Sequence, residues 1–276
     1  MIRILFLLTF MVSHSLAVAE VIKIGVRAHK GSETAARRWL PTADYLHEKI
    51  PQHDFQIVPY ELIENMETAV ANHELHFVIT HPVAYVDLEI QHGASRLLTL
   101  VRKNDLKHFS SVIFSRADNP DIFTIGDLKG KAFGAVAPKG LGGWLMAKRE
   151  MLHHGLVAEE DLASIDFLTL QPRVVEAVIV GDVEAGTVRT GVLDEYLALH
   201  KIPREHVRII NTKRAENFPY LYSTDIYPEW VFAKTAHDHQ DLAERVSQVL
   251  LSMPVGHPAS LEGKYERWTT PVNYQK

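Results

Sequence analysis

The stretch Val21-Ile22-Lys23-Ile24-Gly25-Val26, near the start of the chain, is apolar at most positions and is typical of a buried β-strand. The residues after it change to a helical pattern over 33–49, with Ser32 as the expected N-cap. A second strand pattern follows at 55–60. Because two strands joined through a helix usually pair in parallel within one sheet, this opening unit predicts an α/β fold.

The same alternation continues towards the C-terminus and restarts once in the middle of the chain. Further strands are expected at 77–80, 97–101, 111–115, 131–136, 166–170, 185–188, 207–210 and 230–233, and further helices at 64–73, 85–91, 143–154, 174–180, 192–200 and 242–253. Two successive units predict two lobes, each a mainly parallel sheet with helices on both faces. The crossovers are expected near 109–111 and 220–227. Lobe I then comprises 20–109 and 224–276, and lobe II comprises 110–223.

The composition is that of an ordinary globular protein. Hydrophobic residues make up 46% and charged residues 23% of the 276 positions, which excludes a disordered chain and a multi-span membrane protein. The net charge of −5 argues against a nucleic-acid-binding protein, because such proteins usually carry a basic excess. The lack of cysteine excludes disulfides, a thiol nucleophile and zinc sites built on thiolates.

The first 19 residues have the pattern of a cleavable signal peptide. Arg3 precedes an apolar run over 4–12, and Ala17-Val18-Ala19 is the small-x-small site that a signal peptidase recognises. The run is too short to span ~30 Å of hydrocarbon. We therefore expect export to the periplasm, cleavage after Ala19, and no direct membrane insertion of the mature chain.

A glycine-rich loop, Pro138-Lys139-Gly140-Leu141-Gly142-Gly143, lies between a predicted strand and a predicted helix. Helix N-termini present free N–H groups and a positive dipole end, and glycine lets a ligand approach the backbone closely. The loop therefore favours an oxyanion as ligand, with Gly140, Gly142 and Gly143 as candidate contacts. The alternative is a plain strand-to-helix turn.

A second such loop is Thr80-His81-Pro82-Val83-Ala84-Tyr85. Pro82 fits an early helical position, so the hydroxyl of Thr80 and the ring of His81 could point into a cleft. Ligands of open parallel sheets bind beyond the carboxyl ends of the strands, which is where both loops are expected. A turn that only caps its helix is an equally good reading.

Arginine and hydroxyl side chains occupy comparable positions elsewhere. Arg189 and Thr190 follow one predicted strand, and Arg27 follows the first. Arginine offers a planar fork of donors to an anion, so two arginines facing one cleft would indicate an anionic ligand. Ser110 and Ser111, at the first expected crossover, could add hydroxyl donors. The alternative for each arginine is a surface salt bridge.

Motifs for metals and catalysis are weak. The 16 histidines are scattered, and neither an H-E-x-x-H pattern nor a G-x-S-x-G nucleophile elbow occurs. We therefore expect no metal, no cofactor and no catalytic residue.

Four segments of the chain, taken together, resemble one known family. They are Trp39-Leu40-Pro41-Thr42-Ala43-Asp44-Tyr45-Leu46, Thr80-His81-Pro82, Gly181-Asp182-Val183-Glu184-Ala185-Gly186-Thr187-Val188-Arg189-Thr190-Gly191 and Tyr227-Pro228-Glu229-Trp230-Val231-Phe232-Ala233. They are similar to the phosphonate-binding branch of the periplasmic solute-binding proteins. Within that branch they most resemble the periplasmic sensor region of tetrathionate-type two-component histidine kinases. The likeness covers nearly all of the chain after the leader.

The resemblance implies a two-lobed, type II periplasmic binding fold that closes around a small ligand. In the family's transporters, hydroxyl-rich residues at a helix N-terminus hold the phosphonate, and acidic residues hold an amino group. Here the corresponding loop at 138–143 has no Ser or Thr, and Arg189-Thr190 stands in the second stretch. These departures favour a ligand that is anionic throughout. Because a sensor kinase would continue past Tyr274, we expect a free-standing binding protein or an isolated sensory unit.

The sequence thus predicts a non-enzymatic periplasmic receptor for a small oxyanion, either an oxidised sulfur compound, phosphate or a phosphonate. A membrane partner, a histidine kinase or an ABC permease, would recognise the closed form. The alternative is a secreted hydrolase or lyase that uses His81 or another cleft histidine as its general base, although no local motif supports it.

Overall fold

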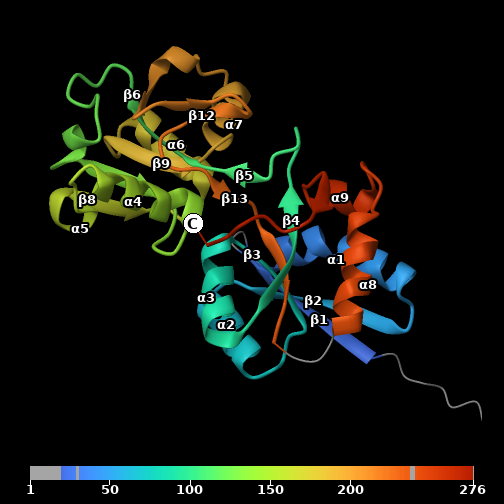
Figure 1. The fold of residues 1–276 in the computed structure, drawn as a ribbon. Coiled ribbons are helices and arrows are strands. Elements are labelled where there is room, and N and C mark those ends of the chain that lie inside the picture. The colour runs from blue at the N-terminus through green and yellow to red at the C-terminus, as the bar shows by residue number, and fades with distance from the viewer. Residues whose placement is uncertain (1–19, 29–30, 237–239, 276) are drawn as a thin grey trace, which may run out of the picture.

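The computed structural model describes residues 20–28, 31–236 and 240–275, and the expected signal peptide lies outside them. The chain forms two lobes, each built on its own sheet (Figure 1). The strands of the first sheet, in order across it, are β15 (Arg267–Thr269), β4 (Ser95–Val101), β14 (Val231–Lys234), β3 (Phe77–Thr80), β1 (Glu20–Arg27) and β2 (His53–Tyr60). We call this sheet and its helices lobe I.

Most strands of lobe I run in one direction. β1 pairs in parallel with both β2 and β3, whereas β14 is antiparallel to its neighbours β3 and β4. It follows that β4 runs with β3, and that only β14 and β15 are reversed among the six strands.

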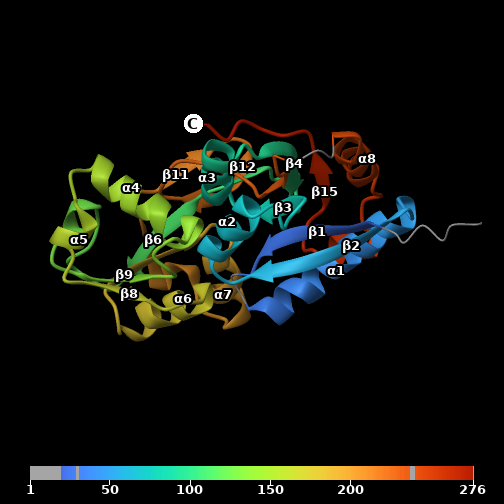
Figure 2. The same cartoon turned by 90° about the horizontal axis from the view of Figure 1, so that it is seen from below.

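Helices cover both faces of this sheet. They are α1 (Ser32–Lys49), α2 (Ile63–Ala71), α3 (Pro82–His92), α8 (Gln240–Leu251) and α9 (Pro258–Glu262). Successive residues of a strand point to opposite faces. In β14, Phe232 accordingly packs with Trp39 and Trp268 beneath α1, whereas Val231 packs with Met66 and Tyr85 of α2 and α3. Figure 2 shows α1 running along β1 and β2.

The second sheet, with its helices, is lobe II. Its strands in order are β10 (Val207–Ile210), β6 (Ser111–Arg116), β9 (Ala185–Arg189), β7 (Ala132–Ala135) and β8 (Ser164–Phe167). Only β6 runs against the other four. The α/β class with mainly parallel sheets, predicted from the sequence, is confirmed in both lobes.

The helical segments of lobe II also lie on both faces of its sheet. Trp144 and Met151 pack on one face, and Val174 and Leu193 pack on the other. The segments are η1 (Gly126–Leu128), η2 (Leu141–Leu145), α4 (Met146–His153), α5 (Ala158–Asp161), α6 (Gln171–Val180), α7 (Val192–Leu199) and η3 (Arg204–His206).

Short strands join the lobes. β5 (His108–Phe109), on the way into lobe II, pairs with β13 (Tyr227–Pro228), on the way back. Next to this pair, the Ser110 Oγ lies 2.9 Å from the Thr224 Oγ1, which ties the two crossing segments together. A separate ribbon of β11 (Lys213–Ala215) and β12 (Phe218–Tyr222) precedes the return.

Two local predictions are wrong. Ser32 is not the N-cap of α1 but its first residue, because its hydroxyl donates to the Glu61 Oε1 at 2.8 Å, and Gly31 caps the helix without a side-chain bond. The strand expected at 166–170 occupies Ser164–Phe167 instead. It ends early because α6 begins at Gln171, where Pro172 suits the first helical turn.

Candidate anion-binding site

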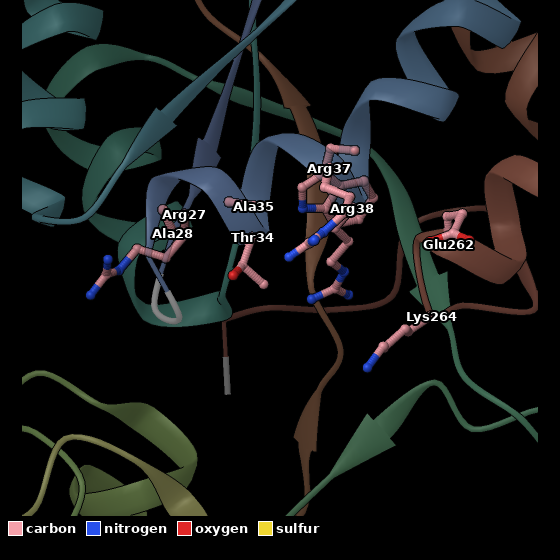
Figure 3. Close-up of a pocket in the computed structure, with 9 residues that line it drawn as sticks. Arg27, Ala28, Thr34, Ala35, Arg37, Arg38, Glu262 and Lys264 are labelled. Carbon is pink, nitrogen blue, oxygen red and sulfur yellow. The ribbon is translucent and has the colours of Figure 1, made fainter.

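A cationic pocket opens in lobe I at the carboxyl end of β1 (Figure 3). It has a volume of about 190 Å³ and is lined by Arg27, Ala28, Thr34, Ala35, Arg37, Arg38, Trp39, Glu262 and Lys264. Figure 3 shows Arg37 and Arg38 together on α1, with Arg27 to one side and Lys264 to the other. Four cationic side chains and one carboxylate line the pocket, so the pocket suits an anion.

A buried carboxylate lies beside this pocket. The side chain of Glu229 is fully buried, and its Oε1 accepts hydrogen bonds from the Arg102 Nε at 3.3 Å and from the Arg189 Nη2. Its Oε2 accepts the backbone N–H of Trp230 at 3.2 Å. Burial alone would raise the pKa of Glu229, but Arg189 and Arg102 more than offset this and lower it. Glu229 is therefore a carboxylate held between two guanidinium groups.

Arg38 lies on the pocket side of Glu229, Arg102 and Arg189, and we call these four residues the arginine cluster. The guanidinium of Arg38 lies 4.7 Å from the ring centre of Trp39 and 5.5 Å from that of Trp230, and its Nε donates to the Gly263 carbonyl at 2.8 Å. The Arg38 Nη2 is buried and has no hydrogen-bond partner within residues 20–28, 31–236 and 240–275. A buried cationic donor without an acceptor is costly, so a bound oxyanion would be favoured at this nitrogen.

The charges around Arg38 also favour a bound anion. Burial lowers the pKa of Arg38 to about 9; the like charges of Arg102 and Arg189 add to this effect, and Glu229 opposes it. The cluster thus contains more positive charge than Glu229 neutralises. An anion in the pocket would relieve this excess.

The glycine-rich loop at 138–143 in lobe II, which we call the glycine turn, lies against the arginine cluster. A Cβ at Gly142 would stand 2.9 Å from the Phe109 ring and 3.3 Å from the Arg189 Cβ, so this approach requires glycine. The Arg189 guanidinium lies 4.1 Å from the centre of the Phe109 ring. Lys139 in the turn forms an ion pair with Glu64 of α2, which brings lobe II onto lobe I.

Thr80 and His81 end β3 and begin α3. His81 is the N-cap of α3, where its Nδ1 accepts the Ala84 N–H at 3.3 Å. The Thr80 Oγ1 is buried and has no hydrogen-bond partner in the described part of the chain. Burial lowers the pKa of His81 to about 4, with a smaller contribution from the nearby charge of Arg27. His81 is therefore a neutral ring near Arg27 at physiological pH.

This burial predicts a pH dependence of stability. Below pH 6.5 a histidine of the unfolded chain takes up a proton, whereas folded His81 resists it until about pH 4. The free energy of unfolding should therefore fall between pH 6.5 and 4, by up to about 3 kcal/mol from this group. Urea unfolding of His81→Asn, which keeps a capping acceptor, should lose this part of the pH dependence. The control His257→Asn removes another helix-capping histidine, and an equal loss there would contradict the assignment.

The structure brings several of the predicted residues together. Arg189 contacts the glycine turn at Gly142. Arg27 lines the pocket, and its charge lowers the pKa of His81. In addition, the Nη1 of Arg27 donates to the Tyr60 carbonyl at 3.1 Å and to that of Glu61. The surface salt bridge considered for Arg189 is wrong, because its partner Glu229 has no exposed side-chain area.

The hydroxyl residues of the crossover bond within the protein. The Ser111 Oγ donates to the Gly142 carbonyl at 2.8 Å, and the Thr190 Oγ1 accepts the Ser110 N–H at 3.2 Å. Ser110 and Ser111 have no exposed surface. The Gly140 N–H is also used internally, by the Ala137 carbonyl at 2.9 Å. These groups shape the crossover and the turn around the cluster.

Sequence reasoning missed Arg38, Arg102, Glu229 and Lys264. Two of them had a usable signal: Arg38 belongs to a pair of arginines in the first half of a helix, and Glu229 lies inside the Tyr-Pro-Glu-Trp segment. Arg102 and Lys264 lie in connecting segments without a motif.

Within residues 20–28, 31–236 and 240–275, no three or more His, Cys, Asp or Glu side chains are grouped so as to hold a metal ion. No helix in these ranges has the length and apolarity needed to cross a membrane.

Two mainly parallel α/β lobes joined by two crossing segments form the type II periplasmic binding-protein fold. The sequence model of the family described as "ABC transporter, phosphonate, periplasmic substrate-binding protein" matches residues 24–270. The chain belongs to this family of solute-binding proteins.

One relative is a sensor. The chain is 31% identical over 256 residues to the tetrathionate sensor histidine kinase TtrS of Salmonella typhimurium, a match that covers 86% of this chain. The match spans only 41% of the length of that relative.

Two solved structures share the fold. XAC2383 from Xanthomonas citri bound to ATP matches with a TM-score of 0.74 and 19% identity, covering 92% of each chain. PhnD1 from Prochlorococcus marinus in complex with methylphosphonate matches with a TM-score of 0.72 and 14% identity, covering 94% of this chain and 96% of that one. At these identities the likeness concerns the fold.

Proposed function

We propose that this protein is a periplasmic receptor that closes around a small oxyanion and presents its closed form to a membrane partner. The observation that carries the proposal is the excess of guanidinium groups around Glu229, together with the buried, unpartnered Nη2 of Arg38 beside a cationic pocket. A buried excess of cationic donors is stabilised by an anion that brings several acceptor oxygens.

The two lobes would supply different parts of the site. In lobe I, Arg27, Arg38 and Lys264 line the pocket. From lobe II, Arg189 and the turn at 138–143 would approach the ligand as the lobes close, with hinges near 109–111 and 220–227. The buried serines Ser110 and Ser111 would support the crossover and make no ligand contact. A ligand that contacts both lobes gains interactions only in the closed form and so shifts the population towards it.

The ligand candidates are an oxidised sulfur compound, phosphate and a phosphonate. TtrS is named as a tetrathionate sensor and PhnD1 was solved with methylphosphonate, which favours anions of these two classes. The same comparisons favour a histidine kinase or an ABC permease as the partner. The leader pattern over residues 1–19 supports export to the periplasm.

The hydrolase or lyase alternative receives no support from His81. Its Nδ1 already accepts the Ala84 N–H, and its side chain is almost fully buried. With Nδ1 as the acceptor, the proton of the neutral ring is on Nε2, so neither nitrogen keeps the free lone pair that a general base needs.

A thermal-shift panel tests the proposal. The anions are tetrathionate, thiosulfate, sulfite, phosphate, phosphite and methylphosphonate, each compared with sodium chloride at equal ionic strength. A true ligand at 100 times its dissociation constant should stabilise the folded protein by about 2.7 kcal/mol. If no member of the panel raises Tm above the chloride control, the oxyanion proposal is wrong. Turnover of a ligand by the pure protein would instead revive the enzyme alternative.

A further inference from the structure

Glu229 lies where the two lobes and the pocket meet. Its Oε1 accepts hydrogen bonds from Arg102, which directly follows β4 in lobe I, and from Arg189, the last residue of β9 in lobe II. Arg38 of α1 is close enough for Glu229 to raise its pKa. One carboxylate therefore contacts or faces three guanidinium groups from three separate elements.

The three guanidinium groups repel one another. Arg102 and Arg189 both act to lower the pKa of Arg38, and Arg189 acts to lower that of Arg102. The side chains of Arg102 and Arg189 are only 23% and 22% exposed, so water screens this repulsion poorly. Since Arg189 belongs to the other lobe, the repulsion also opposes closure. Glu229 is the group that offsets it.

We infer that Glu229 is a built-in counter-anion, a positioning residue that holds Arg102 and Arg189 together across the lobes and leaves two positive charges of Arg38, Arg102 and Arg189 uncompensated, in addition to the other cations of the pocket. This inference rests on the proposed function and assigns a charge to its ligand class: an anion of at least two charges, without an amino group. An acidic residue that binds a ligand's amino group needs a carboxylate oxygen that the ligand can reach. The side chain of Glu229 has no exposed area, and both of its oxygens accept hydrogen bonds from protein donors.

The test replaces the carboxylate by its neutral isostere, Glu229→Gln. With three positive charges unneutralised, the folded protein should require an external anion, and sodium sulfate serves as the probe against sodium chloride at equal ionic strength. We expect the apparent dissociation constant for sulfate, from the concentration dependence of Tm, to be roughly tenfold or more below that of wild type. Sulfate also stabilises proteins non-specifically, so a matched control is needed.

The control is Glu150→Gln. Glu150 is also a buried carboxylate, which accepts from the Lys213 Nζ at 2.8 Å and the Asn211 Nδ2 at 2.7 Å in lobe II. It should lose stability without gaining a sulfate dependence. Equal sulfate responses of the two variants, or weaker sulfate binding by Glu229→Gln than by wild type, would overturn the inference.

A double variant covers the case in which Glu229→Gln does not fold. Arg102→Gln combined with Glu229→Gln removes one charge of each sign and restores the net charge of two. It should fold without sulfate and have a higher Tm than the single variant. A double variant no more stable than Glu229→Gln would mean that Glu229 acts only through its hydrogen bonds. The panel on wild-type protein reports separately on the proposed function, since it can fail while these variants still differ.

Discussion

Replacement of Arg38 by glutamine should weaken binding of the oxyanion by roughly 30-fold or more, equivalent to about 2–5 kcal/mol. The reason is that Arg38 joins the pocket to the arginine cluster, and its Nη2 is a buried donor that lacks an acceptor among the described residues. Truncation of one partner of a buried charged pair leaves the other charge unpaired. Glutamine keeps much of the side-chain length but removes the charge.

Isothermal titration with the best anion of the thermal-shift panel measures this loss. Arg38→Lys separates charge from geometry, since lysine keeps the charge but lacks the planar fork, and it should bind with intermediate affinity. Arg116→Gln is the surface control, because Arg116 is partly exposed and pairs with Asp118 in lobe II. Affinity that survives in Arg38→Gln as it does in Arg116→Gln would remove Arg38 from the site.

Replacement of Trp39 by alanine should reduce the free energy of unfolding by roughly 3–5 kcal/mol and also weaken anion binding. Trp39 is 1% exposed in the core of lobe I, with its ring centre 5.9 Å from that of Tyr265 and 6.2 Å from that of Trp268. Its other neighbour is the Arg38 guanidinium, at 4.7 Å. The cavity would therefore affect both the core and the orientation of Arg38.

Phe133→Ala is the matched control for this variant. Phe133 is fully buried in the core of lobe II, packed with Trp144. Both variants should lose comparable stability in urea unfolding, but only Trp39→Ala should lose anion affinity, measured at a temperature where both are folded. If Trp39→Ala binds the anion as tightly as Phe133→Ala does, Trp39 acts only in the core of lobe I.

The location of the proposed binding residues suggests a way for a small anion to drive closure of the two lobes. The cationic pocket belongs to lobe I, and Arg189 and the glycine turn belong to lobe II. The exposed ion pair of Lys139 and Glu64 contributes little to closure, because water and salt screen it. A buried anion among desolvated arginines is screened much less. The free energy for closure is therefore expected to come mainly from the ligand.

The order of strands and helices could be read from the sequence, because local patterns determine these elements. Apolar runs identified nearly all long strands, whereas the helix expected at 85–91 begins earlier, at Pro82, a residue that fits an early helical position. The glycine turn was also recognisable, since few residues other than glycine allow so close an approach as that of Gly142 to Phe109. Short pairings such as β5 with β13 were not found, because two-residue strands have no period of their own.

The composition of the site was decided by tertiary structure. Arg38, Arg102, Arg189 and Glu229 lie in segments far apart in the chain, and the sequence marked only Arg189 among them as a candidate anion contact. They meet because the ends of β4 and β9 and the start of β14 converge between the lobes, where Arg102 and Arg189 both pair with Glu229. Whether an arginine is exposed or buried depends on this packing, and burial is what makes its charge important for binding. The sequence alone determined a two-lobed α/β receptor fold, whereas packing determined which charges lie within it.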